Sequence, residues 1–387
     1  MMLLFIAMAN VSLYLWGQEP AGAASHPRAE TLVDSALSVF AIVFVDGHVY
    51  PMFAFLFGYG ITQFATARIR RGIPPQTVSR MLLRRHLWLL AFGAIHALLL
   101  FAGDILGAYA LTGLALAALL LRGNDRLIRT LLWVLGTVCA GLMLLGAAGV
   151  LILSTLLPAE LWTADMMMLS NADIMAGVSD YWAAMLARIG QWLLFSVMQV
   201  VTILVPFAVL LGGYAARHRW LEGTTRRLSL TTVAGWGIPI GAIGSVPAAL
   251  DYLEAWPSTL LSSVGWMIIA QLCGIAGGIG YVALFGLIGQ RARAGSRGIV
   301  GAIAAVGKRS LSFYLLQSLA FAPLLSAWGL GWGATISTAG AYALAGAVWL
   351  VSIAAGVLLE RAGRRGPAEA LLRRLTYGSD DTVPRSP

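Results

Sequence analysis

The chain has 387 residues, of which 59% are hydrophobic and only 11% are charged, and its mean hydropathy is +0.81. Soluble globular domains carry about 25% charged residues, so this composition excludes that class and indicates an integral membrane protein. The net charge of +9 does not indicate nucleic-acid binding, because the Lys and Arg residues lie in short segments between apolar runs, where such residues set membrane orientation.

We expect an all-α, polytopic bundle of about ten transmembrane helices, because apolar runs of a length that spans hydrocarbon, roughly 17 to 25 residues, recur along the chain. In chain order the predicted spans are 2–16, 47–67, 85–103, 105–121, 130–153, 189–214, 229–250, 259–288, 303–326 and 336–359. They make residues 1–360 one transmembrane domain.

Two predicted segments lie outside the spans on the outer face. Residues 31–46 have an apolar core that is too short to cross, so they are predicted to lie on that face or to dip into it. A full crossing there would reverse the first helix. Residues 154–188 are predicted to form the longest outer loop.

The positive charges orient this arrangement. When the loops 68–84, 122–129, 215–228 and 289–302 and the tail from residue 360 are placed inside, together with the flanking Arg85, Lys308 and Arg309, only Arg28 and Arg188 remain outside. This asymmetry is typical of cytoplasmic loops, so we predict a multi-pass protein of the bacterial cytoplasmic membrane with both ends inside. The tail, 361–387, contains GPAEALLRRLTYG, which predicts an interfacial amphipathic helix against the anionic inner leaflet.

Few ionisable residues fall at membrane depth, and the cost of placing them there makes each a candidate functional residue. His96 lies within LAFGAIHALLLFAGD, and Asp104 follows it by eight residues, about two helical turns. Asp46 and His48 lie at the outer start of the second predicted span, where we expect them to bind substrate. Two histidines and two carboxylates near one face suit general acid–base chemistry, proton relay or metal binding.

Each of these residues also has a structural interpretation. His96 can bond a carbonyl of a neighbouring helix, Asp46 and His48 can cap a helix at the interface, and Asp104 can accept N–H groups of the following helix. The sequence has no HExxH, GxSxG, P-loop or paired CxxC spacing, so we assign no metal site. The run GIAGGIG (274–280) lies in an apolar span and indicates close helix packing.

A third polar cluster lies in KRSLSFYLLQS (308–318), at the inner end of a predicted span. Its polar side chains either bond across helices or bind substrate: Ser312, Tyr314 and Gln317. Four basic residues at the inner mouth either anchor the helices or bind the phosphate groups of a donor: Arg84, Arg85, Lys308 and Arg309.

Three segments together carry a family resemblance: MFAFLFGYGITQ (52–63), RRHLWLLAFGAIHALLLFAGDILGAYALTGL (84–114), and VGKRSLSFYLLQS (306–318) followed by residues 366–378. They resemble the YeiB-like family of bacterial membrane proteins, which is mostly uncharacterised. The resemblance covers nearly the whole chain. Family members usually have a basic lead into the first helix, whereas this chain begins at MMLLFIAMAN, so either the start is assigned late or the lead is absent.

The family is in turn similar to the transmembrane acyltransferases, which carry an acyl group from a cytoplasmic donor to an acceptor across the membrane by means of a membrane histidine. The resemblance implies that His96 handles the acyl group, with Asp104 orienting it, that acyl-CoA is the donor, and that a lipid or surface glycan is the acceptor. The alternative is a transporter or exporter of a small molecule or lipid, which Pro-interrupted helices favour. A third hypothesis is a structural or stress-related membrane protein that neither catalyses a reaction nor transports a substrate. Expected partners are membrane lipids and a second copy of the chain, not nucleic acid.

Overall fold

The computed structural model describes residues 2–19, 21, 26–158, 171–222, 229–291 and 298–377, and within these ranges no element is a strand. Six described helices are long and apolar enough to cross a membrane: α4 (Pro75–Leu99), α6 (Asp125–Leu156), α8 (Tyr181–Val201), α10 (Leu230–Tyr252), α11 (Leu260–Arg291) and α14 (Thr338–Arg361). The predicted all-α, multi-pass architecture is confirmed. The described helices give six to eight crossings, and do not confirm about ten.

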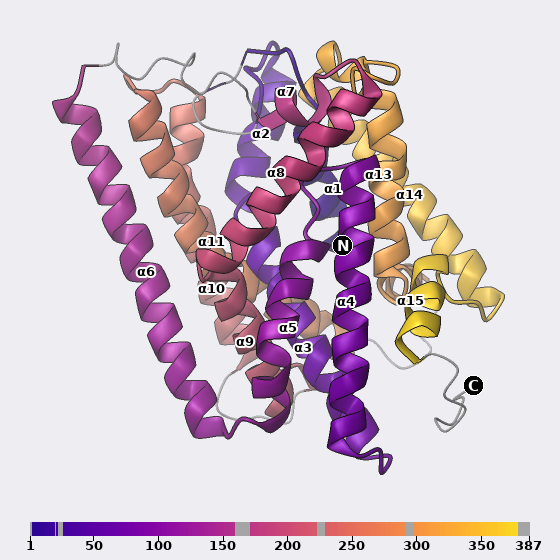
Figure 1. The fold of residues 1–387 in the computed structure, drawn as a ribbon. Coiled ribbons are helices and arrows are strands. Elements are labelled where there is room, and N and C mark those ends of the chain that lie inside the picture. The colour runs from indigo at the N-terminus through magenta and orange to yellow at the C-terminus, as the bar shows by residue number, and fades with distance from the viewer. Residues whose placement is uncertain are drawn as a thin grey trace.

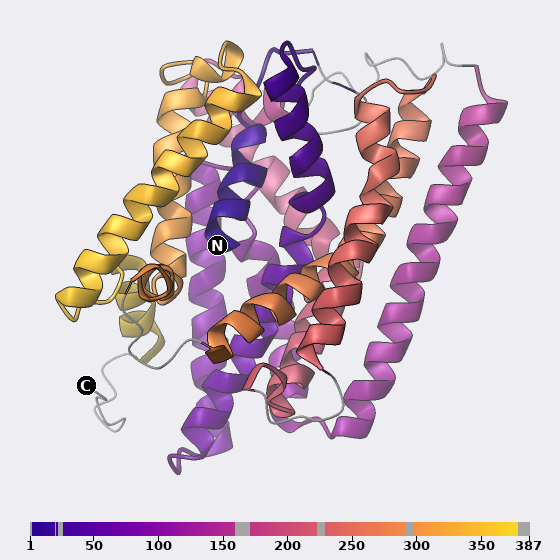
Figure 2. The same cartoon turned by 180° about the vertical axis from the view of Figure 1, so that it is seen from behind.

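Two crossings arise only if a bent pair of helices counts as one span. α2 (Leu32–Phe44) meets α3 (Val49–Ile69) at 41°, and α12 (Ile299–Gly307) meets α13 (Ser310–Leu325) at 85°. The predicted outer-face segment 31–46 therefore contains α2, which enters the bundle from the upper end of Figure 2 and is continued by α3.

Three apolar helices are shorter than a full span: α1 (Met2–Ser12), α5 (Leu106–Arg122) and α9 (Leu204–Arg217). Figure 1 shows α5 and α9 in the lower part of the bundle and α1 in the upper part, so each covers only part of its height. The other short elements are α7 (Asn171–Ala176), α15 (Pro367–Tyr377) and the 3-10 turns Trp220–Glu222 and Trp332–Ala334.

The predicted span 189–214 is broken into α8 and α9. Ile203, between them, has φ 67°, a left-handed conformation that is strained for a β-branched residue. The break turns the chain so that α9 leaves the path of α8 and packs along α3. An uninterrupted apolar run gives no sign of this break, because hydropathy measures length and not direction.

The glycine run 274–280 lies in α11 against α10, and these two helices form the most extensively packed pair. A Cβ atom added at Gly280 would lie 2.7 Å from the backbone N of Ile238, closer than real Cβ contacts allow. The run therefore brings two helix backbones together, as predicted.

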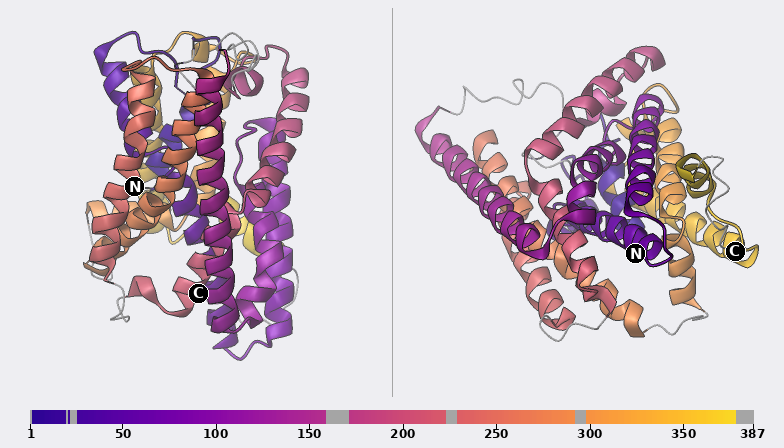
Figure 3. Two further views of the ribbon diagram at one scale, coloured as in Figure 1. Left: turned by 90° about the vertical axis from the view of Figure 1, so that its left-hand side faces the viewer. Right: turned by 60° about the horizontal axis from the view of Figure 1, so that its bottom comes forward.

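The bundle has one basic end. Figure 1 shows the α3–α4 and α5–α6 connections and the C-terminal region toward its lower side. α6 stands at the edge of the bundle, where Figure 3 shows it well separated from α8, while α15 packs on α4 and α13. The amphipathic tail helix thus exists, with Leu372 buried beside Leu89 of α4 and Leu371 exposed.

Candidate functional site

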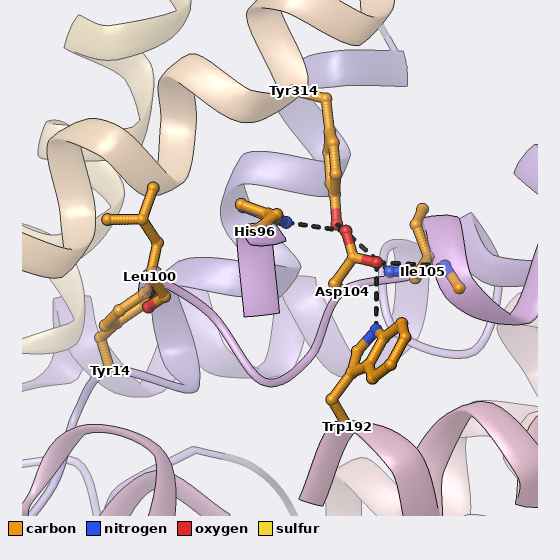
Figure 4. Close-up of polar contacts among 8 residues, drawn as sticks. Tyr14, His96, Leu100, Asp104, Ile105, Trp192 and Tyr314 are labelled. Carbon is orange, nitrogen blue, oxygen red and sulfur yellow. Dashed lines mark hydrogen bonds and ion pairs between the residues drawn. The ribbon is translucent and has the colours of Figure 1, made fainter. Parts of the chain in front are cut away.

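The short connection between α4 and α5 carries a buried carboxylate on which four hydrogen-bond donors converge (Figure 4). Asp104 accepts from His96 Nδ1 at 2.7 Å and from the Tyr314 hydroxyl at 3.3 Å through Oδ2. Its Oδ1 accepts from Trp192 Nε1 at 3.2 Å and from the backbone N–H of Gly107 at 3.1 Å. Only an ionised carboxylate accepts at every position, so this environment suits an anion.

Four elements build this network. His96 stands in the last turn of α4, Gly107 opens α5, and Trp192 and Tyr314 come from α8 and α13. The site needs a very close approach of α4 to the carboxylate, because a Cβ atom added at Gly93 would lie 2.6 Å from Asp104 Oδ1. The two residues that the sequence singled out are therefore in direct contact.

His96 is 4% exposed and presents Nδ1 to a group that only accepts, so Nδ1 carries the ring proton. Nε2 then keeps its lone pair, and it is buried without a hydrogen-bond partner among the described residues. An imidazole oriented in this way by a carboxylate can take a proton from a hydroxyl group or attack a carbonyl carbon. Asp104 also has the structural role considered above, since it accepts a hydrogen bond from the backbone N–H of Gly107 in the first turn of α5.

Tyr314 belongs to the site. Its hydroxyl donates to Asp104 and accepts from the backbone N–H of Ile105 at 3.3 Å, and its ring stands edge-on to His96 with the centroids 5.3 Å apart. The sequence predicted Tyr314 as a substrate contact, and the structure brings it to the His96–Asp104 pair.

The other two polar residues predicted on α13 contact other helices. Gln317 Nε2 donates to the carbonyl of Leu3 at 2.8 Å and so joins α13 to α1. Ser312 Oγ bonds Glu369 of α15 at 2.5 Å. Both contacts match the structural interpretation of these polar side chains.

Asp46 and His48 lie at the bend between α2 and α3 and form a separate cluster. His48 is fully buried and donates from Nδ1 to the carbonyl of Asp46 at 2.6 Å. The Asp46 carboxylate pairs with His26 Nε2, also at 2.6 Å, which makes a second histidine–carboxylate pair. Sequence reasoning missed His26 because it lies in the connection between the first predicted span and the segment 31–46, outside any apolar run.

A cavity of about 660 Å³ opens at the basic end, between α3, α4, α13, α15 and the residues that lead from α14 to α15. Its apolar lining includes Phe53, Phe57, Phe64, Leu89, Leu106, Leu311 and Leu372. Its charged lining is Arg68, Arg85, Lys308, Arg309, Glu360, Arg364, Arg365, Glu369 and Arg373. Tyr314 also lines it, so one side chain belongs both to the cavity wall and to the donors around Asp104.

Three of the four basic residues predicted to bind a donor line this cavity: Arg85, Lys308 and Arg309. Arg84 is exposed and is not among the lining residues. Glu360 engages Lys308 Nζ at 2.6 Å and Arg309 Nη1 at 2.7 Å, so these two cations have a carboxylate partner.

Arg188, which the sequence marked only as an outer cation, is completely buried. Its guanidinium donates to the carbonyl of Leu98 at 3.1 Å and to that of Leu99 at 3.4 Å, at the C-terminal end of α4. A cation there offsets the negative end of the helix dipole. Arg188 therefore fixes the end of the helix that carries His96. Among the described residues no cluster of three His, Cys, Asp or Glu side chains could hold a metal ion.

Comparison with known proteins gives a relative across most of the chain. It is 32% identical over 352 residues to the uncharacterized protein YeiB of Escherichia coli (strain K12), and the match covers 84% of this chain and 80% of that protein. Residues 215–379 match a family described as a protein of unknown function (DUF418). No solved structure gives a significant match.

Proposed function

The chain belongs to the YeiB-like family of membrane proteins, and from this premise we propose that it is a membrane-bound acyltransferase. It transfers an acyl group from a cytoplasmic donor, acyl-CoA, to a lipid or a cell-surface glycan. The observation that carries this proposal is the buried His96–Asp104 pair, whose histidine keeps one ring nitrogen free of any partner among the described residues. A buried pair of this kind is costly in a membrane protein, which favours a chemical role.

In the proposed reaction His96 Nε2 takes the proton from an acceptor hydroxyl group. The hydroxyl oxygen attacks the thioester carbonyl carbon, the carbon–sulfur bond breaks, and the leaving thiolate receives that proton from the imidazolium. Asp104 keeps the ring in the required tautomer and stabilises the positive charge that develops on it. An apolar surrounding strengthens this charge interaction, because little water screens it.

The donor is proposed to enter through the cavity at the basic end. Tyr314 supports this route, since it lines the cavity and bonds the carboxylate that orients His96. In this proposal the basic end faces the cytoplasm, the protein lies in the bacterial cytoplasmic membrane, and both chain ends are inside. Arginine-rich connections at one end of a bundle favour that orientation.

The test uses full-length protein in lipid nanodiscs with acyl-labelled acetyl-CoA and a bacterial lipid and glycan extract as acceptor. Thiol release and labelled product are both measured. We expect His96→Gln to lower turnover by roughly 10³-fold. The matched control is His86→Gln, because His86 is also buried on α4 but bonds the carbonyl of Leu82 at 2.7 Å instead of a carboxylate. Equal turnover in the two variants would refute the proposal.

A second candidate function is transport of a small molecule or lipid. The break at Thr202–Ile203, the 85° bend between α12 and α13 and the short helices α5 and α9 favour it, since transporters bind substrates at interrupted helices. Substrate accumulation in proteoliposomes that Asp104→Asn abolishes, without thiol release from acyl-CoA, would select this function over the enzyme.

A further inference from the structure

Three arginines from three helices, α3, α4 and α15, share two aromatic rings at the basic end. Arg68 of α3 lies over the ring of Phe64, with Cζ 3.3 Å from the centroid, and Arg85 of α4 approaches the same ring at 5.4 Å. Arg68 and Arg373 of α15 each lie 5.4 Å from the ring centroid of Tyr377. All five side chains line the cavity. We call the three guanidinium groups the arginine cluster.

The arginine cluster has no carboxylate partner among the described residues, since none of its members is in an ion pair there. The two acidic residues of the cavity are engaged elsewhere. Glu360 pairs with Lys308 and Arg309, and Glu369 accepts from the backbone N–H groups that open α13. Cations held close together with no anion repel one another, and a dianionic ligand relieves that cost.

Burial and the neighbouring charge of Arg365 both lower the pKa of the Arg373 guanidinium. Within the cluster, Arg68 donates from Nη1 to the carbonyl of Phe64 at 2.9 Å and from Nη2 to the Tyr377 hydroxyl. Its Nε is buried without a partner among the described residues. Guanidinium groups with a free face bind phosphate through two parallel N–H donors, which a lysine does not provide.

The cavity changes from charged to apolar along α3. Phe53, Phe57, Phe64 and Arg68 all line it, at spacings of four, seven and four residues, which keeps them on one face of the helix. From Arg68 to Phe53 this face is about 22 Å long at 1.5 Å per residue. A phosphate at one end of such a wall and a hydrocarbon chain along the rest would match its chemistry.

We propose that the arginine cluster binds the phosphate of an amphiphilic ligand whose apolar part lies along Phe53 and Phe57, so that α15 forms part of a ligand site. The proposal that a ligand binds here rests on the residues that line the cavity. Only the identification of the ligand with the acyl donor rests on the proposed function. Of the four residues expected from sequence to bind phosphate (Arg84, Arg85, Lys308 and Arg309), this site contains only Arg85, and it adds Arg68 and Arg373.

The test measures binding of octanoyl-CoA to full-length protein in phosphatidylcholine nanodiscs by isothermal titration calorimetry. We expect Arg85→Gln and Arg373→Gln each to raise Kd about tenfold, the loss of one charge-assisted bond to phosphate. The matched control is Arg84→Gln, which removes the same charge one residue away at an exposed position outside the cavity. Its Kd should change by less than about twofold. Thermal unfolding of each variant checks that it is folded.

A second arm distinguishes a soluble phosphate ligand from a lipid headgroup. Nanodiscs with phosphatidylglycerol are examined by native mass spectrometry for retained lipid. If a lipid is the ligand, Arg85→Gln loses bound phosphatidylglycerol while Arg84→Gln keeps it, and octanoyl-CoA binding does not depend on the cluster. Equal effects of the Arg84 and Arg85 substitutions in both arms overturn the proposal.

The His96→Gln variant separates this inference from the proposed function. It should bind octanoyl-CoA with the wild-type Kd and fail to transfer the acyl group. Arg85-dependent binding without turnover in any variant would leave the ligand site in place and remove the acyltransferase.

Discussion

The molecule contains two histidine–carboxylate pairs of nearly equal length that differ in their surroundings. In the His96–Asp104 pair both side chains are at most 2% exposed, and in the His26–Asp46 pair the carboxylate is 35% exposed. Asp104 has three further donors, whereas Asp46 is partly exposed to solvent, which screens its charge. The same two groups therefore form a closed interior network in one place and, in the other, a buried histidine paired with a partly exposed carboxylate.

Both pairs have a short nitrogen–oxygen distance, so the length of this bond does not identify the functional pair. The interior network fixes the tautomer, the rotamer and the charge of its members together, because every acceptor position on Asp104 is used. In the His26–Asp46 pair only the carboxylate, which is 35% exposed, can exchange its partner for water. We therefore expect substitutions at the two carboxylates to differ strongly in effect.

The largest effect is expected for Asp104→Asn in acyl transfer. An amide cannot hold the Nδ1–H tautomer of His96 or stabilise the imidazolium, so turnover should fall by roughly 10³ to 10⁴-fold. Asp46→Asn serves as the matched change in the other pair and should keep turnover within about tenfold. Initial rates of thiol release from acyl-CoA measure both. If Asp46→Asn lowered turnover as much as Asp104→Asn, the expected difference between the two pairs would be wrong.

The loss of stability should also be larger for a substitution at Asp104 than for the same substitution at Asp46. Asp104→Ala leaves the donors of His96, Trp192 and Tyr314 buried without an acceptor, and removing one partner of such a network costs about 3 to 5 kcal/mol. Asp46→Ala should cost less, about 1 to 3 kcal/mol, because it leaves only one buried donor, that of His26, without an acceptor. Thermal unfolding in one detergent compares the two variants directly, and a smaller midpoint loss at residue 104 than at 46 would contradict the expectation.

The interior pair was accessible to sequence reasoning for a physical reason. His96 and Asp104 are only eight residues apart, and ionisable groups within apolar runs are rare, so both could be singled out from the sequence. Their direct contact could not be predicted, because eight residues of continuous helix would hold them about 12 Å apart, whereas α4 ends at Leu99 and the chain turns back. The fold class followed from hydropathy in the same way. Pairings that depend on the fold did not follow, since Arg68 and Tyr377 are separated by 309 residues.

The number of crossings was harder to predict because hydropathy does not report bends. The run through Thr202 and Ile203 is apolar, yet the chain breaks there, and the segment around Asp46 is a bend within a helix pair instead of a boundary. In each case packing against another helix decides the direction: α9 lies on α3, and His48 lies against the glycines of α10 and α11. The hydropathy of one sequence predicts the length of a helix but not which helices it packs against.

A smaller effect is expected at Tyr314, whose hydroxyl is one of four donors to Asp104. Tyr314→Phe keeps the ring beside His96 and removes one hydrogen bond, which should lower stability by about 1 kcal/mol. Turnover should fall about tenfold, since the carboxylate is then free to shift away from His96. Thermal unfolding and initial rates measure the two quantities. A loss of turnover as large as that of Asp104→Asn would mean that Tyr314 itself takes part in proton transfer.

The smallest effect is expected for His26→Gln, which removes the histidine of the His26–Asp46 pair. Gln can still donate to Asp46, so the midpoint of thermal unfolding should fall by only a few degrees, equivalent to about 1 kcal/mol or less. Turnover should stay within about twofold of wild type, because His26 shares no contact with the His96 network in the described residues. The same assays apply. A turnover loss greater than tenfold in a folded His26→Gln protein would show that the His26–Asp46 pair takes part in the reaction and that the two pairs do not differ in function.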